Sequence, residues 1–482
     1  MAVEDHVLAV DLRPAHPQRV EEGEVVACHV VPVYGFRNSR GVAWTRPPLF
    51  GSIGRFRRPR TDHRGGRMLR FIALAAAAAL AAPAAWAQDS IKIAILGPMA
   101  FAQGENHWAG AELARDEINK AGGISVAGKK KQIELVRVDT NEIQSVTDAT
   151  NAMERAITRD KADFVIGGFR SEAVLAMQEV AMDNKKLFLG VGAADAKLGA
   201  NVEKDYNRYK YWFRVLPLNS PDLGKTIFTV LGSIAGQIRT SLDKETPKVA
   251  ILAEKVLWTQ AIVAAAQANL PKMKMEVVGL WQPSPTATDV TAELAAIERA
   301  GADIVFTALS GPVGIVVGRQ MGERNLKAIA FGINVEAQKD GFWQATAAKG
   351  NFVATLDTYS EVELTPKTVA FVKAFKARFH KAPTYTAATY DAITLLKESI
   401  EKAGSADPDK LVPVLEQTSS VGTAAHLEFT KTHDPVWGIG KSSGIAVQWQ
   451  DGEKVPFWPP QVKGMKAFKL PGARQAKAEP AK

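Results

Sequence analysis

The sequence predicts an α/β protein made of two doubly wound lobes, and three observations carry this prediction. Short apolar segments, typical of parallel strands buried on both faces, alternate with longer segments of helical length. The alternation occurs four times between residues 91 and 192, and it begins again at residue 247. Beyond position 87 the chain holds 395 residues, enough for two or three domains. Such alternation is typical of a mostly parallel sheet with helices on both faces.

The first lobe is expected to begin with "IKIAILGPM" (91–99), because an uninterrupted apolar run suits a buried parallel strand. The next segment, "ENHWAGAELARDEINKAGG", predicts a helix that ends at Gly122-Gly123, since glycine commonly ends helices. The other predicted strands of this lobe are 131–140, 163–168 and 187–192, and the other predicted helices are 145–160 and 171–185.

The second lobe repeats this order of elements. Its predicted strands are 247–255, 275–283, 302–310 and 328–333, and its predicted helices are 258–269, 288–300 and 312–324. After the segment 352–366, two more helices are expected over 368–381 and 385–404. The stretch "GIAVQWQDGEKVPFWPP" (444–460) predicts a closing β-hairpin with its turn at Asp451-Gly452. Residues 466–482 are expected to form a disordered tail.

An earlier segment, "MLRFIALAAAAALAAPAAWAQDS" (68–90), has the order of parts of a secretory signal peptide. An arginine supplies the positive start, an apolar run follows, and Ala85-Trp86-Ala87 is a small-x-small cleavage site. The apolar run is shorter than a membrane-spanning helix, which needs ~20 residues. We therefore expect residues 68–87 to be a signal peptide cleaved after Ala87, which places the mature protein in the periplasm.

Residues 1–67 differ in composition from the rest of the chain. Up to residue 87 there are twelve arginines and no lysine, whereas the remainder holds thirty-five lysines and thirteen arginines. Because a signal sequence does not act 67 residues into a chain, residues 1–67 are expected to be a non-native upstream extension. Without residues 1–87 the net charge falls from +9 to +4, so basicity gives little reason to expect a nucleic-acid partner.

Signatures of catalysis and metal binding are missing from the sequence beyond residue 87. The only cysteine, Cys28, precedes that point, which excludes a thiolate nucleophile and a cysteine metal site. The four histidines beyond it are scattered, with no HExxH or H-x-E pair. The loop "GVGAADAKLG" (190–199) lacks the third glycine of a nucleotide fingerprint, and no G-x-S-x-G elbow occurs. We therefore expect no catalytic residue, metal or cofactor.

A ligand site is expected at the carboxyl ends of the strands, where open α/β sheets bind ligands. Helix N-termini at this edge offer free N–H groups and a partial positive charge, which suit a carboxylate. Three loops of the first lobe meet this requirement. They are "MAFAQGE" (99–105), which contains Phe101 and Gln103, "GGFRSEA" (167–173), and "GVGAADA" (190–196). Ser171 is placed to cap the helix that follows the second loop.

The segment "IKIAILGPMAFAQGENHWAGAELARDEINKAGGI" resembles the start of type I periplasmic binding proteins, in the leucine/isoleucine/valine-binding branch of ABC-transporter substrate-binding proteins. The motifs "ADFVIGG", "ATYDAITLLKESIEKAG" and "VQWQDGEKVPFWP" resemble the same branch. The resemblance covers nearly all of residues 89–465, with the motifs in the expected order. It implies a monomer that binds a small solute in an interlobe cleft and delivers it to a membrane permease.

The resemblance also implies two Rossmann-like lobes joined by three crossover strands. The crossovers are expected near 214–222, 350–360 and 425–440. Lobe one would then comprise residues 89–215 with 355–425, and lobe two residues 220–350 with 430–460.

The resemblance assigns roles to individual residues. Ser171 and Glu172 match the position that grips the α-carboxylate of an amino acid, and Ala193, Ala194 and Asp195 match the loop that contributes to ammonium binding. Several family members have threonine in place of Asp195, which either pairs with an ammonium or caps the next helix. Trp258 matches an aromatic residue that often covers the ligand. The segments 309–314 and 331–338, which include Ser310, complete the wall.

One departure from the family pattern bears on the ligand. Asn334 is the nearest match to a glutamate that pairs with the ligand ammonium, and Glu336 follows two residues later. A neutral asparagine does not balance a buried ammonium, and an unpaired buried charge is costly. Arg170, beside the expected carboxylate site, is suited either to pair with an acid or to lie on a solvated rim. Phe101 and Trp108 are more typical of core aromatic residues than of residues that stack on a ligand.

The ligand class stays open from sequence alone. Aliphatic amino acids follow from the resemblance, aromatic or other organic acids are the main competitor, and short amides or urea are more distant. The same fold also serves in ligand-sensing receptors, which carry a membrane helix after the domain, and in regulators, which lack a signal peptide. Neither arrangement is expected here, and transport is the preferred interpretation.

Overall fold

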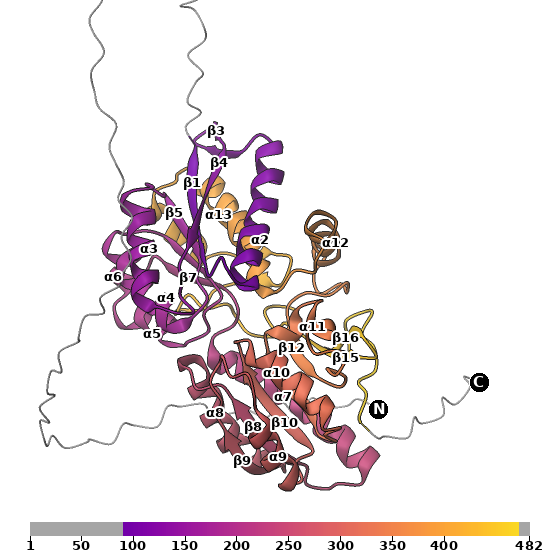
Figure 1. The fold of residues 1–482 in the computed structure, drawn as a ribbon. Helices are drawn as coiled ribbons and strands as arrows, with labels where there is room; N and C mark the ends of the chain where they lie inside the picture. The colour runs from indigo at the N-terminus through magenta and orange to yellow at the C-terminus, as the bar shows by residue number, and fades with distance from the viewer. Residues whose placement is uncertain (1–89, 472–482) are drawn as a thin grey trace, which may run out of the picture. The chain divides into compact units, whose positions relative to one another are not determined.

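The computed structural model describes residues 90–471 (Figure 1). The predictions for 1–67, 68–87 and 472–482 lie outside the described residues. The first half of the described chain contains a five-stranded parallel sheet with the order β4-β1-β5-β6-β7. Its strands are β1 (Ile91–Gly97), β4 (Ile133–Asp139), β5 (Phe164–Gly167), β6 (Phe188–Val191) and β7 (Trp212–Leu216).

The helices of this half pack in pairs. Helix α2 (Ala102–Lys120) packs against α13 (Thr389–Ala403), which comes from much later in the chain, and α3 (Val146–Thr158) packs against α4 (Ser171–Asp183). Helix α3 begins where the Ser145 side chain accepts a hydrogen bond from Asp148 N. The shorter elements are α5 (Lys197–Lys204), α6 (Tyr206–Tyr209) and the hairpin of β2 (Ile124–Val126) and β3 (Lys129–Lys131).

A second parallel sheet has the order β11-β10-β8-β9. Its strands are β8 (Lys248–Ala253), β9 (Glu276–Trp281), β10 (Ile304–Leu309) and β11 (Ile329–Asn334). Its helices are α7 (Ser220–Leu242), α8 (Leu257–Asn269), η1 (Pro271–Met273), α9 (Thr291–Arg299), α10 (Val313–Glu323), η2 (Glu336–Gln338) and α11 (Phe342–Ala345). Helix α7 is not among the predicted elements, although Asn219 caps it and Pro221 lies in its first turn.

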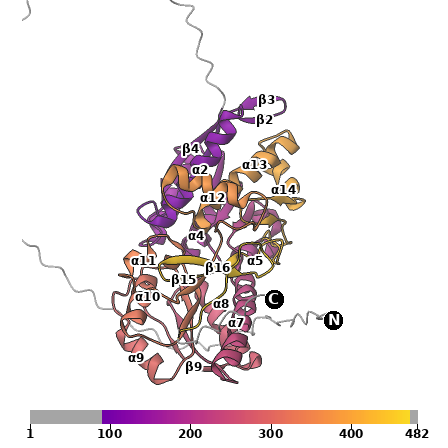
Figure 2. The same ribbon diagram turned by 90° about the vertical axis from the view of Figure 1, so that its right-hand side faces the viewer.

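A third, antiparallel sheet has the order β12-β15-β16 and lies beside β11 (Figure 2). It consists of β12 (Ala354–Asp357), β15 (Ile445–Gln450) and β16 (Glu453–Trp458). The predicted hairpin is confirmed, because β15 and β16 pair across a turn at Asp451 and Gly452. Between β12 and β15 the chain forms α12 (Thr368–Phe379), η3 (Tyr385–Ala388), α13, α14 (Pro408–Glu416), β13 (Ser420–Val421) and β14 (His426–Leu427).

This order of elements takes the chain back and forth between the two parallel sheets. It leaves the first sheet after β7, returns after β12 to place α13 against α2, and leaves again after β14 to form β15. The predicted α/β class with two parallel sheets is confirmed. The exact limits of the two lobes stay a prediction.

Residues 466–471 differ from the expected disordered tail. Lys466 N donates to Pro456 O (2.8 Å), and Lys469 N donates to the Gln448 side chain (2.9 Å). The Phe468 ring packs 4.7 Å from that of Phe457. Leu470 is buried in the same apolar core, so the segment is attached by both apolar contacts and hydrogen bonds. Within residues 90–471, none of the helices is long and apolar enough to cross a membrane.

Candidate functional site

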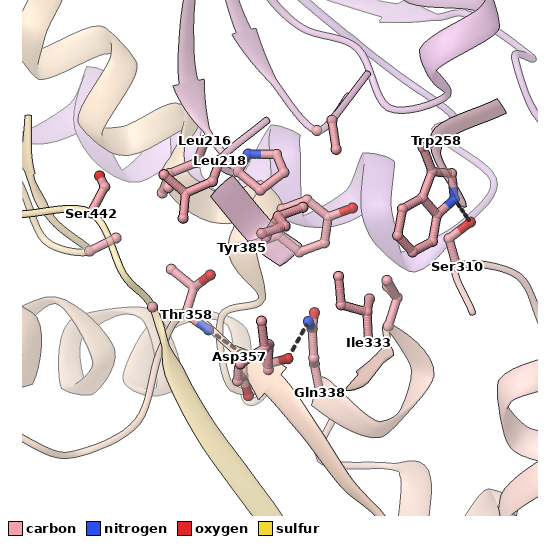
Figure 3. A pocket seen from close by; sticks show the side chains of 18 of the residues that line it. Leu216, Leu218, Trp258, Ser310, Ile333, Gln338, Asp357, Thr358, Tyr385 and Ser442 are labelled. Atoms are coloured by element: carbon pink, nitrogen blue, oxygen red, sulfur yellow. Dashed lines mark hydrogen bonds between the residues drawn. The ribbon is translucent and has the colours of Figure 1, made fainter. Parts of the chain in front are cut away.

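A mainly apolar cavity lies where the carboxyl ends of both parallel sheets meet the segments that connect them (Figure 3). The empty space among its lining residues, open solvent at its mouth included, is about 850 Å³. Its apolar walls come from Phe169, Ala194, Leu216, Pro217, Leu218, Leu223, Trp258, Ile333, Val335, Leu356, Tyr385, Ala424 and Ala425. Its polar side chains come from Arg170, Ser171, Ser310, Gln338, Asp357, Thr358, Ser442 and Ser443. The cavity suits a small molecule with an apolar body and a few polar groups.

The first polar end of the cavity is the N-terminus of α4. This helix spans 13 residues, and its first residue, Ser171, lines the cavity beside Arg170. The first N–H groups of a helix have no intrahelical partner, and the helix dipole adds positive potential there. The Arg170 guanidinium is mostly buried, and its Nε lies 3.6 Å from Glu172 Oε2. These groups lie where the sequence predicts a carboxylate site, in the loop after β5.

A buried glutamate, Glu142, fixes the loop that carries this site. Its Oε2 accepts hydrogen bonds from the backbone N–H groups of Phe169 (2.9 Å) and Arg170 (2.7 Å), and its Oε1 accepts one from the Thr140 hydroxyl (2.7 Å). Burial raises the pKa of Glu142, and these hydrogen bonds oppose the rise. Glu142 therefore positions the arginine and the helix start without lining the cavity.

The wall on the second sheet is organised by another buried glutamate, Glu254. Its Oε1 accepts from the Trp258 Nε1 (3.2 Å) and from the Ser310 hydroxyl, and its Oε2 accepts from Gly311 N (2.9 Å). Trp258 Nε1 also lies 3.2 Å from Ser310 Oγ (Figure 3). The predicted pocket residues Trp258 and Ser310 thus line the cavity as one hydrogen-bonded unit.

Asp195 and its neighbours act mainly as structural groups. Ala194 lines the cavity, but Ala193 and Asp195 do not. The Asp195 carboxylate accepts from Lys197 N (2.7 Å) at the start of α5, which is the capping alternative rather than an ammonium partner. Arg214 Nη2 donates to Asp195 O (2.8 Å), and the Ser171 hydroxyl accepts from Asp195 N (3.2 Å).

Asn334 and Glu336 also lie off the cavity lining. Asn334 is buried, with its Nδ2 donating to Gly314 O (3.1 Å) and its Oδ1 accepting from Ala337 N (3.4 Å). Glu336 pairs with Lys339 at 2.7 Å. The residue that lines the cavity after β11 is the apolar Val335. Strand β11 ends at Asn334, where the alternation of side chains places Ile333 toward the cavity and Asn334 away from it, and Val335 follows in helical backbone.

The other predicted residues outside the lining are Glu172, Phe101 and Gln103. Glu172 Oε1 accepts a hydrogen bond from Leu257 N (2.9 Å), so it joins the start of α4 to the start of α8. Phe101 is the residue before α2, and Gln103 is buried in the first turn of that helix. Gln103 O accepts from the Thr386 hydroxyl (2.9 Å), which attaches η3 to α2.

The sequence reading missed the cavity residues that come from the connecting segments. Tyr385 lies across the cavity in Figure 3, and Leu216, Leu218 and Asp357 surround it from other segments. Burial raises the pKa of the Tyr385 phenol, and the negative charges of Glu142 and Glu254 raise it further. The phenol is therefore neutral at physiological pH and can donate a hydrogen bond.

Asp357 is the only acidic side chain among the described residues that line the cavity. It is fully buried and pairs with Lys454 on β16 at 3.0 Å. Burial raises the pKa of Asp357, whereas the charge of Lys454 opposes the rise. Lys454 Nζ also donates to Gln338 O. The charge of Asp357 is thus compensated within the protein. No group of three or more potential metal ligands occurs among the described residues.

Known proteins resemble the chain over most of its length. A leucine-, isoleucine-, valine-, threonine- and alanine-binding protein of Pseudomonas aeruginosa is 26% identical over 76% of this chain and 93% of its own. A Leu/Ile/Val-binding protein homologue of Brucella suis is 25% identical over 79% of this chain and 95% of its own.

Solved structures share the fold. A branched-chain amino acid transporter substrate binding protein of Streptococcus pneumoniae in complex with isoleucine has a TM-score of 0.62 and 21% identity, over 76% of this chain and 98% of its own. A solute binding protein of an ABC transporter from Rhodopseudomonas palustris in complex with 3,4-dihydroxybenzoic acid has a TM-score of 0.62 and 22% identity, over 77% of this chain and 96% of its own.

A family model described as periplasmic binding protein matches residues 90–453, which is most of the chain. This match covers both parallel sheets and the segments around the cavity. The chain therefore belongs to the periplasmic binding protein family, whose members bind small solutes outside the cytoplasm.

Proposed function

We propose that this chain is the solute-binding component of an ABC transporter and that its ligand is a small carboxylic acid without an ammonium group. The signal peptide at 68–87 would direct it across the inner membrane, with cleavage after Ala87. The acid would bind between the two lobes and shift the hinge equilibrium toward a closed form that a membrane permease recognises.

The observation that carries the ligand class is the absence of an uncompensated carboxylate among the described cavity-lining residues. Asp357 is paired with Lys454, and Val335 lines the cavity after β11. A desolvated ammonium without a partner is costly, because a buried unpaired charge loses its hydration. The α4 N-terminus, Arg170 and Ser171 suit a carboxylate, and the remaining wall suits an apolar body.

The test compares acids that differ only in the amino group. Residues 88–482 would be unfolded and refolded to remove bound ligand, and thermal shifts would be recorded with leucine against 4-methylpentanoate and phenylalanine against 3-phenylpropanoate, with benzoate as a rigid acid. A ligand at a hundred times its Kd adds about 2.7 kcal/mol of stability. We expect shifts with the ammonium-free acids only. A shift with leucine or phenylalanine and none with their deaminated partners would contradict the proposed ligand class.

Delivery and location need separate measurements. Residues 68–482 expressed in a Gram-negative host should be recovered from the periplasm with Gln88 as the first residue, as determined by mass spectrometry. Uptake of a bound acid should depend on both this chain and a permease. Recovery of the uncleaved chain from the cytoplasm would contradict the proposed export.

A further inference from the structure

We infer that the cavity has a second polar subsite, formed by Gln338 and Thr358, which selects acids that carry a hydroxyl group remote from the carboxylate. This inference rests on the proposed function, because it deepens the ligand class from acid to hydroxylated acid. Gln338 and Thr358 both line the cavity, and Figure 3 shows them on either side of Asp357.

The first observation is an unpartnered acceptor. Gln338 is 5% exposed, and its Oε1 is buried with no hydrogen-bond partner within the described structure. A buried polar atom without a partner costs about 1–3 kcal/mol. Ser442, which is 1% exposed and also lines the cavity, has an unpartnered Oγ as well. Two buried polar atoms without partners in one cavity indicate that the ligand supplies hydrogen bonds to them.

The orientation of the Gln338 amide follows from its surroundings. Its Nε2 donates to Leu356 O (2.9 Å), and a carbonyl oxygen can only accept, so the nitrogen must be the atom on that side. The Oε1 is therefore the remaining atom, and it is an acceptor. The group that meets it has to be a donor, such as a hydroxyl or an amide N–H.

The backbone around this acceptor is fixed by the buried ion pair. Lys454 Nζ donates to Gln338 O and also pairs with Asp357. Asp357 in turn accepts from Thr358 N (2.7 Å). Gln338 and Thr358 are thus held by one hydrogen-bonded group, and the Thr358 hydroxyl adds a second donor or acceptor in the same wall. A preorganised pair of this kind suits a ligand hydroxyl, which both donates and accepts.

The apolar surface of the cavity indicates the shape of the ligand between its two polar groups. Trp258, Tyr385 and Ile333 surround the middle of the cavity in Figure 3, and flat aromatic rings stack well on such walls. The ligand chemistry that fits is a carboxylate, an aromatic or similarly rigid body, and a hydroxyl on the far side. Sites that hydrogen-bond a hydroxyl discriminate strongly against analogues without it.

The test measures the affinities of benzoate, 3-hydroxybenzoate, 4-hydroxybenzoate and 4-methoxybenzoate by calorimetry. For residues 88–482 with the natural sequence, we expect at least one hydroxybenzoate to bind 10-fold or more tightly than benzoate, which is about 1.4 kcal/mol. The methoxy compound has no donor and should lose this gain. In Gln338→Met and in Thr358→Val, the ratio of hydroxybenzoate to benzoate affinity should fall toward one.

A matched control is Gln320→Met, the same substitution at a mostly buried glutamine outside the cavity lining. It should keep the full preference for the hydroxyl. If benzoate binds and no hydroxyl adds affinity, the subsite is wrong and the proposed function stands. If amino acids bind and none of the ammonium-free acids does, the proposed function fails and the subsite falls with it. If both Gln338→Met and Thr358→Val keep the preference for hydroxybenzoate over benzoate, the assignment of the hydroxyl subsite to these residues is overturned.

Discussion

Glu142 and Glu254 occupy comparable places in the two halves of the molecule, but they accept hydrogen bonds from different kinds of group. Each follows a parallel strand and is buried beside the loop after another strand of the same sheet, which is β5 for Glu142 and β10 for Glu254. Glu142 binds two main-chain N–H groups and one threonine hydroxyl. Glu254 binds one main-chain N–H group, that of Gly311, and the side chains of Trp258 and Ser310.

The difference separates two ways of building a cavity wall. At Glu142 the carboxylate fixes backbone, so the start of α4 and its free N–H groups are positioned whatever side chains the loop carries. At Glu254 the carboxylate fixes the side chains that face the ligand, so the shape of that wall depends on their identity. The first arrangement suits a general carboxylate site, whereas the second suits recognition of a particular ligand body.

The largest expected effect is that of Glu142→Ala. This change leaves the N–H groups of Phe169 and Arg170 buried without an acceptor, at about 1–3 kcal/mol each. We expect the free energy of unfolding to fall by roughly 2–4 kcal/mol and acid binding to weaken at least 10-fold. Urea denaturation and calorimetry would measure both. Unchanged acid affinity in a folded variant would show that the loop does not need this carboxylate.

The sharpest comparison uses the isosteric changes Glu142→Gln and Glu254→Gln. A glutamine at 142 can keep one oxygen on both N–H groups while its amide donates to the Thr140 hydroxyl, so we expect a loss below about 1 kcal/mol. At 254 the amide has to face either Gly311 N–H or Trp258 Nε1–H, both of which are donors. We expect a loss of about 1–3 kcal/mol there. Equal losses in urea denaturation would remove the distinction between the two glutamates.

A smaller effect is expected from the bond that joins the two halves. Glu172→Ala removes the acceptor of Leu257 N, which should weaken acid binding about 5-fold if this bond forms mainly in the closed form. Glu172→Gln retains an acceptor oxygen and serves as the control. Titrations of both variants with the same acid would measure the effect. Identical Kd values for the two variants would show that the bond is equally present with and without ligand.

The smallest expected effect is on the pH dependence of stability. Burial raises the pKa of Glu142 above its unfolded value, so the folded state binds the proton more tightly than the unfolded state. The stabilising contribution of Glu142 to the free energy of unfolding is fully present below its unfolded pKa, near 4.5. This contribution is lost as the pH rises through its pKa in the folded state. Relative to Glu142→Gln, the natural protein should lose stability over that window. A natural protein that gains stability relative to Glu142→Gln as the pH rises through this window would contradict the expected sign.

Much of the fold was predictable because parallel strands and their helices leave strong local patterns. The strands β1, β5, β8 and β10 are apolar runs, and the structure places them as predicted. The helix α7 was missed because its sequence "SPDLGKTIFTVLGSIAGQIRTSL" contains glycines and β-branched residues, which weaken a helical signal.

The candidate site was predictable only where it follows a parallel strand. Ser171, Ala194, Trp258 and Ser310 come soon after strand ends, and they line the cavity. Gln338 lies within the wall segment 331–338 that the resemblance implies, although the resemblance does not single it out there. Tyr385 and Asp357 come from segments whose position depends on the tertiary path of the chain, and their local sequence does not mark them as cavity residues.

The sequence predicted Asn334 in the cavity lining, whereas its neighbour Val335 lines the cavity. A strand side chain changes face with every residue, so an error of one position in a strand end exchanges a cavity residue for a core residue. The Glu254 network had no sequence signal of its own, because Glu254 and Ser310 are 56 residues apart.

The hydrogen bond between Glu172 and Leu257 has a consequence for how such a protein diverges. Its donor is a main-chain N–H group, so almost any side chain at position 257 leaves the bond intact, and only proline removes the donor. Apart from proline at position 257, a substitution that removes this hydrogen bond therefore has to occur at residue 172. The side chain at position 257 is thus free to change in sequence while the connection between the two halves is inherited unaltered.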